Sequence, residues 1–172
     1  MVCANHHTGA VWPGSVGLLK RLGALLLLLP LLASCSGDDT SPESRIRALL
    51  NTAEEAVESR SLSAVSPLLS PAFSDSAGQD KQALLRLLGG YFVTHQSIHL
   101  LTQVSRLDLI GPDRAHVTLY VAVAGQPLKT VSQLISLRAE LIRLDLSLAE
   151  EAGEWLVVSG AWRRAEKSDF LE

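Results

Sequence analysis

The sequence predicts an α+β protein in which N-terminal helices pack on one face of a curved antiparallel sheet. Up to about residue 95, apolar residues recur at spacings of three and four, as on one face of a helix. After Ser97 the spacing changes to two, the period of a half-buried strand. Near the C-terminus, two such segments flank a short glycine-containing turn, the pattern of a β-hairpin. Helices followed by a run of antiparallel strands are typical of an α+β domain.

Residues 1–34 have the pattern of a secretory signal peptide. Lys20 and Arg21 precede the leucine-rich run Leu22–Leu32, and small residues follow it. As a helix, the 13 uncharged residues from Leu22 to Ser34 reach about 20 Å, which is short of the ~30 Å hydrocarbon core of a bilayer. A membrane-spanning helix is therefore disfavoured. The segment before Val16 lacks the usual basic residues, so either Met1 or Val16 is a candidate start of translation.

Cys35 directly follows Leu32-Ala33-Ser34, and this tetrapeptide resembles the lipobox of bacterial lipoproteins. The resemblance implies that the signal is cleaved before Cys35 and that the cysteine carries the acyl chains, such as palmitate, of a membrane anchor. Residues 35–41 are small and polar, as expected for a short flexible tether. Because serine and not aspartate follows the cysteine, the resemblance also implies the outer membrane, with the protein facing the periplasm.

The chain from Cys35 to Glu172 has the size of one domain and an acidic balance. Lys20 and Arg21 are the only charged residues before it, so 13 of the 15 basic residues remain against all 18 acidic ones. The resulting net charge of −5, without a basic cluster, argues against nucleic acid as a partner. Cys35 is its only cysteine, so no internal disulfide is expected.

Three helices are expected in the N-terminal half. The first spans about 17 residues from Pro42, with Ser41 as N-cap and an apolar stripe that includes Ile46 and Leu50. A short second helix is predicted over 62–69, followed by a polar loop over 73–78. The third begins after Asp80, and Gly89-Gly90 within it indicates close packing or a bend.

The strands follow from residue 98. The segment 98–110 is β-rich, but its alternation slips between Thr102 and Arg106, which predicts a β-bulge. A turn at 111–113 leads to a strand over 117–123, whereas 128–139 fits either a helix or a strand. The best hairpin joins 141–148 to 155–162 through a turn at 150–154, with its second strand apolar on both faces and therefore central. A polar tail that frays is expected from Arg163.

This order of elements, together with the closing hairpin Gly153-Glu154-Trp155 to Trp162, resembles the nuclear transport factor 2-like superfamily, including its SnoaL-like and ketosteroid-isomerase-like cones. The resemblance covers about 42–164, leaving 165–172 as the tail. It implies a cone-shaped domain. Members of this superfamily include isomerases, dehydratases, cyclases, ligand carriers and interaction domains, so the fold by itself does not define an activity.

Few residues stand out as catalytic or metal-binding. The sequence holds no nucleophile elbow, phosphate-binding glycine loop or paired-cysteine motif. His95 and His99 are four residues apart, but they straddle a helix-to-strand junction and leave only His116 as a third imidazole, so no metal is expected. The acidic turn that includes Glu150 and Glu154 is interpreted as solvated. If the cone is an enzyme, Tyr91 and His95 are the best pocket candidates.

One strand face carries the most informative polar residues. Thr118, Tyr120, Arg143 and Asp145 are out of phase with the aliphatic residues of their strands, so they are expected on the face opposite the helices. Tyrosine and arginine are enriched at protein interfaces, and the superfamily resemblance implies a homodimer or an envelope partner there. The alternative is a solvated face with an ion pair worth at most ~1 kcal/mol.

Taken together, these patterns predict a membrane-anchored periplasmic lipoprotein that acts as a binding or assembly module and needs no cofactor. A SnoaL-like enzyme acting on a small molecule, or a carrier of a hydrophobic ligand, is the alternative. The enzyme is disfavoured because the strand faces expected to look into the cone offer valine, leucine and isoleucine in place of an acid or a base.

Overall fold

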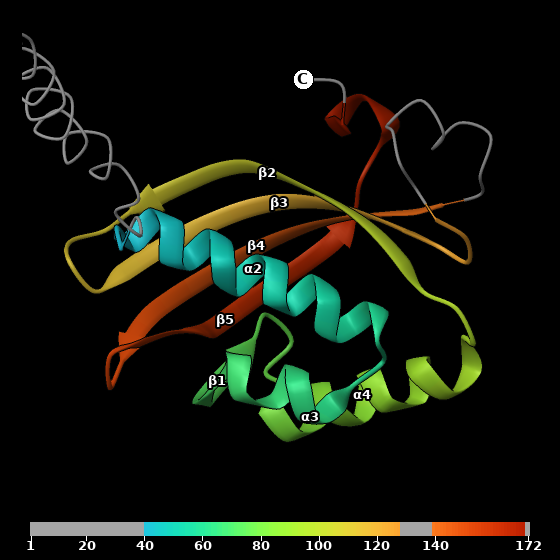
Figure 1. Ribbon diagram of the computed structural model, residues 1–172, viewed down its shortest axis with the longest axis horizontal. Coiled ribbons are helices and arrows are strands. Elements are labelled where there is room, and N and C mark those ends of the chain that lie inside the picture. Colours follow the sequence, from blue (N-terminus) through green and yellow to red (C-terminus); the bar gives the residue numbers. More distant parts are fainter. Residues whose placement is uncertain (1–39, 128–138, 171–172) are drawn as a thin grey trace, which may run out of the picture. The chain divides into compact units, whose positions relative to one another are not determined.

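The computed structural model describes residues 40–127 and 139–170. The predicted signal peptide, the lipobox and most of the tether lie outside the described residues, as does the ambiguous segment 128–138. Thr40–Glu172 is a compact unit distinct from Met1–Asp39. Along the described chain, helices come first and most strands later, as Figure 1 shows. No helix in the described ranges has the length and apolar character needed to cross a membrane.

The three predicted helices are present. Helix α2 (Pro42–Glu58) is capped by the Ser41 hydroxyl, which accepts a hydrogen bond from the Ser44 amide at 3.2 Å. Helix α3 (Leu62–Val65) continues as the 3₁₀ turn η2 (Ser66–Leu68). Helix α4 (Lys81–Thr94) is capped by Asp80 through the Ala83 amide at 2.8 Å. The close packing expected at the glycine pair occurs at Gly89, where a Cβ would lie 3.2 Å from the Leu62 side chain.

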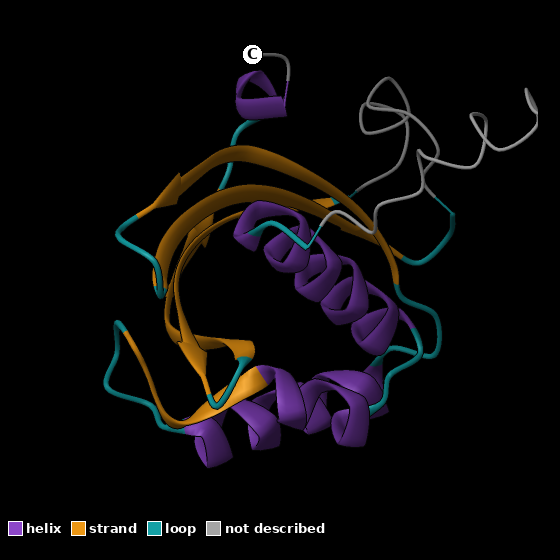
Figure 2. Cartoon of the chain, turned by 60° about the vertical axis from the view of Figure 1, so that its left-hand side comes forward, coloured by secondary structure: helices purple, strands orange, loops and turns teal. Residues whose placement is uncertain are grey.

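The strands form one five-stranded sheet in the order β1-β5-β4-β3-β2. Strands β2 to β5 run antiparallel to one another, whereas β1 is parallel to β5. The sheet is curved and the helices lie within its curve (Figure 2), which confirms the predicted α+β cone. The strand bounds are Leu69–Asp75 for β1, His99–Leu109 for β2, Arg114–Ala124 for β3, Glu140–Glu151 for β4 and Glu154–Arg164 for β5.

Strand β1 was not predicted. Because it runs parallel to β5, the sheet is not purely antiparallel. Its residues read as the end of the second helix and a polar loop, because Pro71 interrupts them and they do not alternate. In the structure Leu69 pairs with Val157 and Asp75 with Gly160, at the edge of the sheet. Proline is tolerated on an edge strand. This pairing depends on a strand 85 residues further along, which no local pattern reveals.

The β-bulge predicted in the first long strand is confirmed. The register of β2 against β3 shifts between Val104 and Arg106, inside the interval where the alternation slips. The β4–β5 turn is tighter than predicted, because the pairing continues to Glu151 and Glu154. Its two central residues, Ala152 and Gly153, have φ values of 51° and 87°, as the two-residue turns that match strand twist require. Strand β5 is interior, as its apolar character predicted.

The prediction that the chain frays from Arg163 is wrong for residues 163–165, which continue strand β5 and its hydrogen bonding. Strand β5 extends to Arg164, and the Ala165 amide donates to the Leu141 carbonyl at 2.8 Å. Ala165 is buried in a small second cluster with Ala122 and Leu141, and a 3₁₀ turn (η4, Lys167–Phe170) follows. A single small apolar residue in a polar segment gives too weak a signal to predict this packing.

The main core lies between the concave face of the sheet and the helices. Ile46 of α2 is fully buried there, beside Phe73 of β1, Val117 of β3 and Trp155 of β5. Next to Ile46, Arg45 forms an ion pair with Glu150 at 2.8 Å and also donates to the Gly153 carbonyl. Helix α2 is thus bound to the sheet by apolar packing and by polar contacts to the β4–β5 turn.

Candidate functional site

A cavity of about 650 Å³ lies inside the curve of the sheet. Its walls come from α2, α4 and strands β1 to β5, together with the segment before β2. Most of its lining is aliphatic or aromatic. The described lining residues are Leu50, Ala53, Glu54, Val57, Leu69, Phe73, Leu84, Leu87, Leu88, Tyr91, Ile98, Leu100, Thr102, Leu119, Val121, Val123, Glu140, Ile142, Leu144, Leu146, Val157, Gly160 and Trp162.

The cavity forms because part of the concave face is not covered by packed side chains. Ile142, Leu144 and Leu146 alternate along β4 on this face, yet each is only half-buried. In contrast, Leu148 further along the same face is 1% exposed and belongs to the main core. The apolar alternation of β4 therefore serves packing at one end of the strand and lines an accessible cavity at the other.

Apart from Trp162 with its indole N–H, only four residues of the described lining have polar side-chain atoms. They are Glu54 of α2, Tyr91 of α4, Thr102 of β2 and Glu140 of β4. No Asp, His, Lys or Arg occurs among the described lining residues. Burial, with the nearby negative charge of Glu140 as a second cause, raises the pKa of Tyr91 above its ordinary value. The phenol therefore remains a neutral hydrogen-bond donor at physiological pH.

The two pocket candidates lie together, but only one of them lines the cavity. The ring of His95 stacks on that of Tyr91 with centroids 3.9 Å apart and planes 18° apart. His95 Nδ1 also lies 2.9 Å from the Tyr91 carbonyl oxygen and 3.0 Å from Thr94 Oγ1. Exposed at the end of α4, His95 supports the position of Tyr91 and is not among the residues that face the cavity.

The sequence did not identify the two glutamates of the lining. Glu54 is a charged residue next to the apolar stripe of the first helix, and Glu140 lies next to the ambiguous segment 128–139. In the structure Glu54 is half-buried, because the cavity extends beneath the border of the apolar stripe of α2. The neighbouring Glu55 is exposed. For a residue at the edge of an apolar stripe, the spacing of apolar residues does not determine whether its side chain faces the interior or the solvent.

The other polar residues singled out in the sequence have local partners. His99 Nε2 lies 3.1 Å from Ser97 Oγ, and His116 Nδ1 lies 3.1 Å from Ser147 Oγ. Among the described residues, no group of three His, Cys, Asp or Glu side chains is arranged to hold a metal ion. The acidic turn is not simply solvated, since Glu150 pairs with Arg45 and Glu151 accepts from Ser70 Oγ at 2.9 Å.

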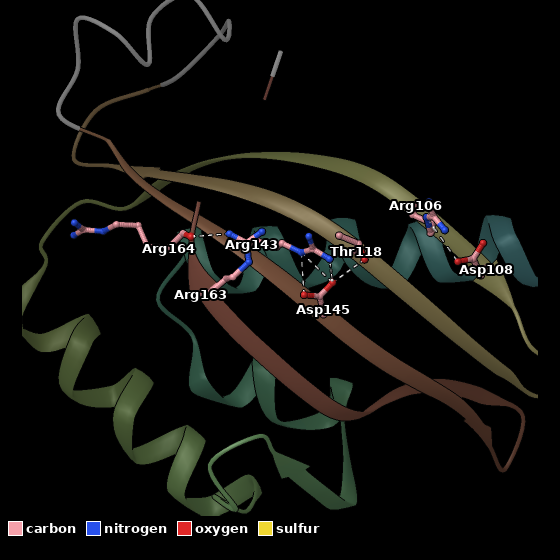
Figure 3. A network of polar contacts seen from close by, with 7 residues as sticks. All are labelled: Arg106, Asp108, Thr118, Arg143, Asp145, Arg163 and Arg164. Atoms are coloured by element: carbon pink, nitrogen blue, oxygen red, sulfur yellow. Dashed lines mark hydrogen bonds and ion pairs between the residues drawn. The ribbon is translucent and has the colours of Figure 1, made fainter. Parts of the chain in front are cut away.

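The four outer-face residues lie together, as the alternation predicts. Thr118 pairs in register with Asp145, and Tyr120 with Arg143. Thr118 Oγ1 donates to Asp145 Oδ1 at 2.8 Å, and Arg143 donates to both carboxylate oxygens (Figure 3). The hydrogen bonds from Arg143 are the main reason that the pKa of Asp145 is below its ordinary value; partial burial opposes them and Thr118 adds to them. Tyr120 packs against the small cluster formed around Ala165.

Replacing Asp145 should reveal a pH-dependent but modest stabilisation. A carboxyl group whose pKa is lowered by folding stabilises the protein above its ordinary pKa and loses this effect as the pH falls through the lowered value. Asp145→Asn is therefore expected to reduce the free energy of unfolding by at most ~1 kcal/mol at about pH 7, and by less at about pH 3. Urea unfolding at both pH values measures the difference.

Asp108→Asn is the matched control, because its ion pair with Arg106 spans 4.0 Å between exposed side chains. We expect no measurable change for this variant at either pH. An Asp145→Asn effect that is equally large at both pH values would contradict the assignment of the stabilisation to the ionised carboxylate.

No model of a protein family matches this sequence, and no curated protein matches it either. Solved structures do match. A scytalone dehydratase, provisionally so named, from Novosphingobium aromaticivorans has a TM-score of 0.60 at 11% identity, over 72% of this chain and 84% of that one. A provisionally named dehydratase of the NTF2-like family from Streptomyces avermitilis has a TM-score of 0.56 at 17% identity, over 73% and 99%. An NTF2-like protein of unknown function from Shewanella baltica has a TM-score of 0.51 at 13% identity, over 72% and 94%.

The chain is thus an α+β cone with an apolar interior cavity, and its fold is that of the nuclear transport factor 2-like proteins. At these identities the similarity defines the fold and not the activity.

Proposed function

We propose that this protein is a lipid-anchored periplasmic binding module whose cone holds an apolar small molecule. The observation that carries the proposal is the cavity itself, whose volume of about 650 Å³ falls within the range of small-molecule sites. Its lining is mainly aliphatic, so the hydrophobic effect favours an apolar ligand. Of the roles considered from the sequence, a carrier of a hydrophobic ligand fits this lining best.

The composition of the lining favours binding over catalysis. General acid–base catalysis requires a positioned acid or base whose pKa is near the operating pH. The described lining offers two glutamates, a threonine and a tyrosine whose pKa is raised. No hydrogen bond joins any two of these side chains, so the described lining contains no pre-assembled nucleophile and base.

The anchor part of the proposal rests on the lipobox at Cys35 and on the polar residues after it. An acyl anchor confines the domain to the membrane surface, where apolar molecules are concentrated. The tether leads into α2 at Ser41, and the cavity-lining residues of α2 begin at Leu50. Membrane attachment and ligand binding therefore use different parts of the same chain.

Binding of a neutral apolar fluorophore tests the cavity. The chain from Ser36 onward contains the whole compact unit and can be titrated with N-phenyl-1-naphthylamine, whose emission rises in apolar surroundings. We expect saturable 1:1 binding, and Leu144→Trp should weaken it by about tenfold or more because the larger ring occupies the cavity. Val93→Trp is the matched control, since Val93 is 84% exposed and outside the lining. Equal binding by the two variants would contradict an internal site.

A second candidate role, self-association through the outer face of the sheet, is favoured by the charge pattern there. Arg106 and Arg163 lie beside Asp108 and Asp145 on this face (Figure 3). A face with both signs of charge can pair with a second copy of itself about a twofold axis.

Light scattering of the chain from Ser36 measures this association. We expect a dimer that Arg143→Glu shifts towards monomer, because the change places like charge beside Asp145. Tyr120→Ala should also weaken the dimer, although part of its effect would arise from packing near Ala165. A wild-type chain that remains monomeric at millimolar concentration would leave this face without a role in self-association.

A further inference from the structure

We propose that the ligand of the cone is a cationic amphiphile, with an apolar body inside the cavity and an amine or quaternary ammonium head paired with Glu54 and Glu140. This inference rests on the proposed binding function and specifies the chemistry of the ligand. It is carried by the charge and position of the polar lining residues.

The charge of the lining has one sign. Glu54 and Glu140 are its only formally charged residues within the described part of the chain, and both are acidic. Neither carboxylate has a hydrogen bond or an ion pair with another described residue. By comparison, the carboxylates of Glu58, Glu150 and Glu151 each accept a hydrogen bond. Within the described residues, the carboxylates of Glu54 and Glu140 are thus left available to a ligand.

Their position suits the head of an amphiphile. Glu140 is exposed although it lines the cavity, so it lies where the cavity opens to solvent. Trp162 also lines the cavity and is 42% exposed. It pairs in register with Leu144, towards the end of β4 that begins with Glu140. A partly exposed indole in the lining can stabilise an ammonium group through the cation–π interaction, and the carboxylate at the opening can pair with its charge. Deeper in the cavity, Leu119 and Val157 are buried and apolar.

The physical consequence is discrimination by charge. The half-buried carboxylate of Glu54 gains more from an ammonium group than a solvated carboxylate such as that of Glu140 does, since the lower dielectric around Glu54 strengthens the attraction. A ligand carboxylate would meet like charge and find no basic partner among the described lining residues. A neutral ligand of equal length gains only from apolar burial. Cationic, neutral and anionic ligands should therefore bind in that order of affinity.

Three probes with the same chain length test this order. Dodecyltrimethylammonium, dodecanol and dodecanoate, each below its micellar concentration, compete with N-phenyl-1-naphthylamine for the chain from Ser36. We expect the affinity of the ammonium probe to be at least about tenfold higher than that of dodecanoate, with the affinity of dodecanol between them. Raising the salt concentration should reduce the preference, because screening weakens charge pairing.

Two isosteric variants locate the charge. Glu54→Gln and Glu140→Gln are each expected to lower the ratio of ammonium to dodecanol affinity by about threefold or more, with little change for dodecanol itself. Glu55→Gln is the matched control, because Glu55 is the exposed neighbour of Glu54 on α2 and does not line the cavity. It should leave all three affinities unchanged.

The outcomes separate the two proposals. If the three probes bind equally, or dodecanoate binds best, the cationic ligand is overturned while the apolar binding site stands. If the fluorophore and all three probes fail to bind, the binding function is overturned and the ligand class with it. An ammonium preference that survives in the double variant Glu54→Gln/Glu140→Gln would also overturn the assignment to these two side chains.

Discussion

Cys35→Ala is expected to abolish membrane attachment and to leave the full-length precursor uncleaved. The lipobox resemblance implies that acylation of the Cys35 sulfur precedes cleavage of the signal, so without the thiol neither step has a substrate. Membrane fractionation, incorporation of labelled palmitate and the mass of the mature chain measure the effect. Sensitivity of processing to globomycin would support the same interpretation.

The other cysteine provides the control for this experiment. Cys3 lies in the predicted signal, so Cys3→Ala should leave both lipidation and cleavage unchanged. A mature chain that begins elsewhere, or that carries an unmodified Cys35, would contradict the predicted anchor.

Ile46→Ala is expected to produce the largest loss of stability in the folded domain, about 2–5 kcal/mol in the free energy of unfolding. Ile46 is fully buried where α2 packs on the sheet, and truncation would remove apolar burial and leave a void. Urea unfolding of the chain from Ser36, followed by circular dichroism, measures the change. A loss below about 1 kcal/mol would mean that α2 contributes little to the core.

Val93→Ala is the matched control for this truncation. Val93 lies near the end of α4 and is 84% exposed, so its methyl groups bury little surface. Its removal is expected to change stability by less than about 0.5 kcal/mol.

The parts of the fold that could be predicted are those that local patterns encode. The cap at Ser41 and the apolar stripe below it define α2, and the slipped alternation between Thr102 and Arg106 places the bulge of β2. The parallel edge strand β1 could not be predicted, because it forms through pairing with the distant strand β5 and because Pro71 interrupts its local strand pattern. The packing of Ala165 on Leu141 escaped prediction for a similar reason.

The candidate site was predictable only on the outside of the sheet. Alternation places Arg143 and Asp145 on the outer face, and the structure brings them together with Thr118. The cavity was not predictable, since the side chains around an empty volume have the same pattern as those in a packed core. Leu144 and Leu148 have the same residue type and the same phase on one strand, yet the first lines the cavity and the second is buried in the core.

The contacts of Arg45 have a mechanical consequence for a chain that is held at its N-terminal end. A pull on the residues before Thr40 enters the domain at Ser41, one helical turn before Arg45. Through its ion pair with Glu150 and its bond to the Gly153 carbonyl, Arg45 passes that load directly to the β4–β5 turn. We therefore expect the sheet and the first turn of α2 to bear such tension together, so that the helix resists unwinding before the cavity-lining residues from Leu50 onward are reached.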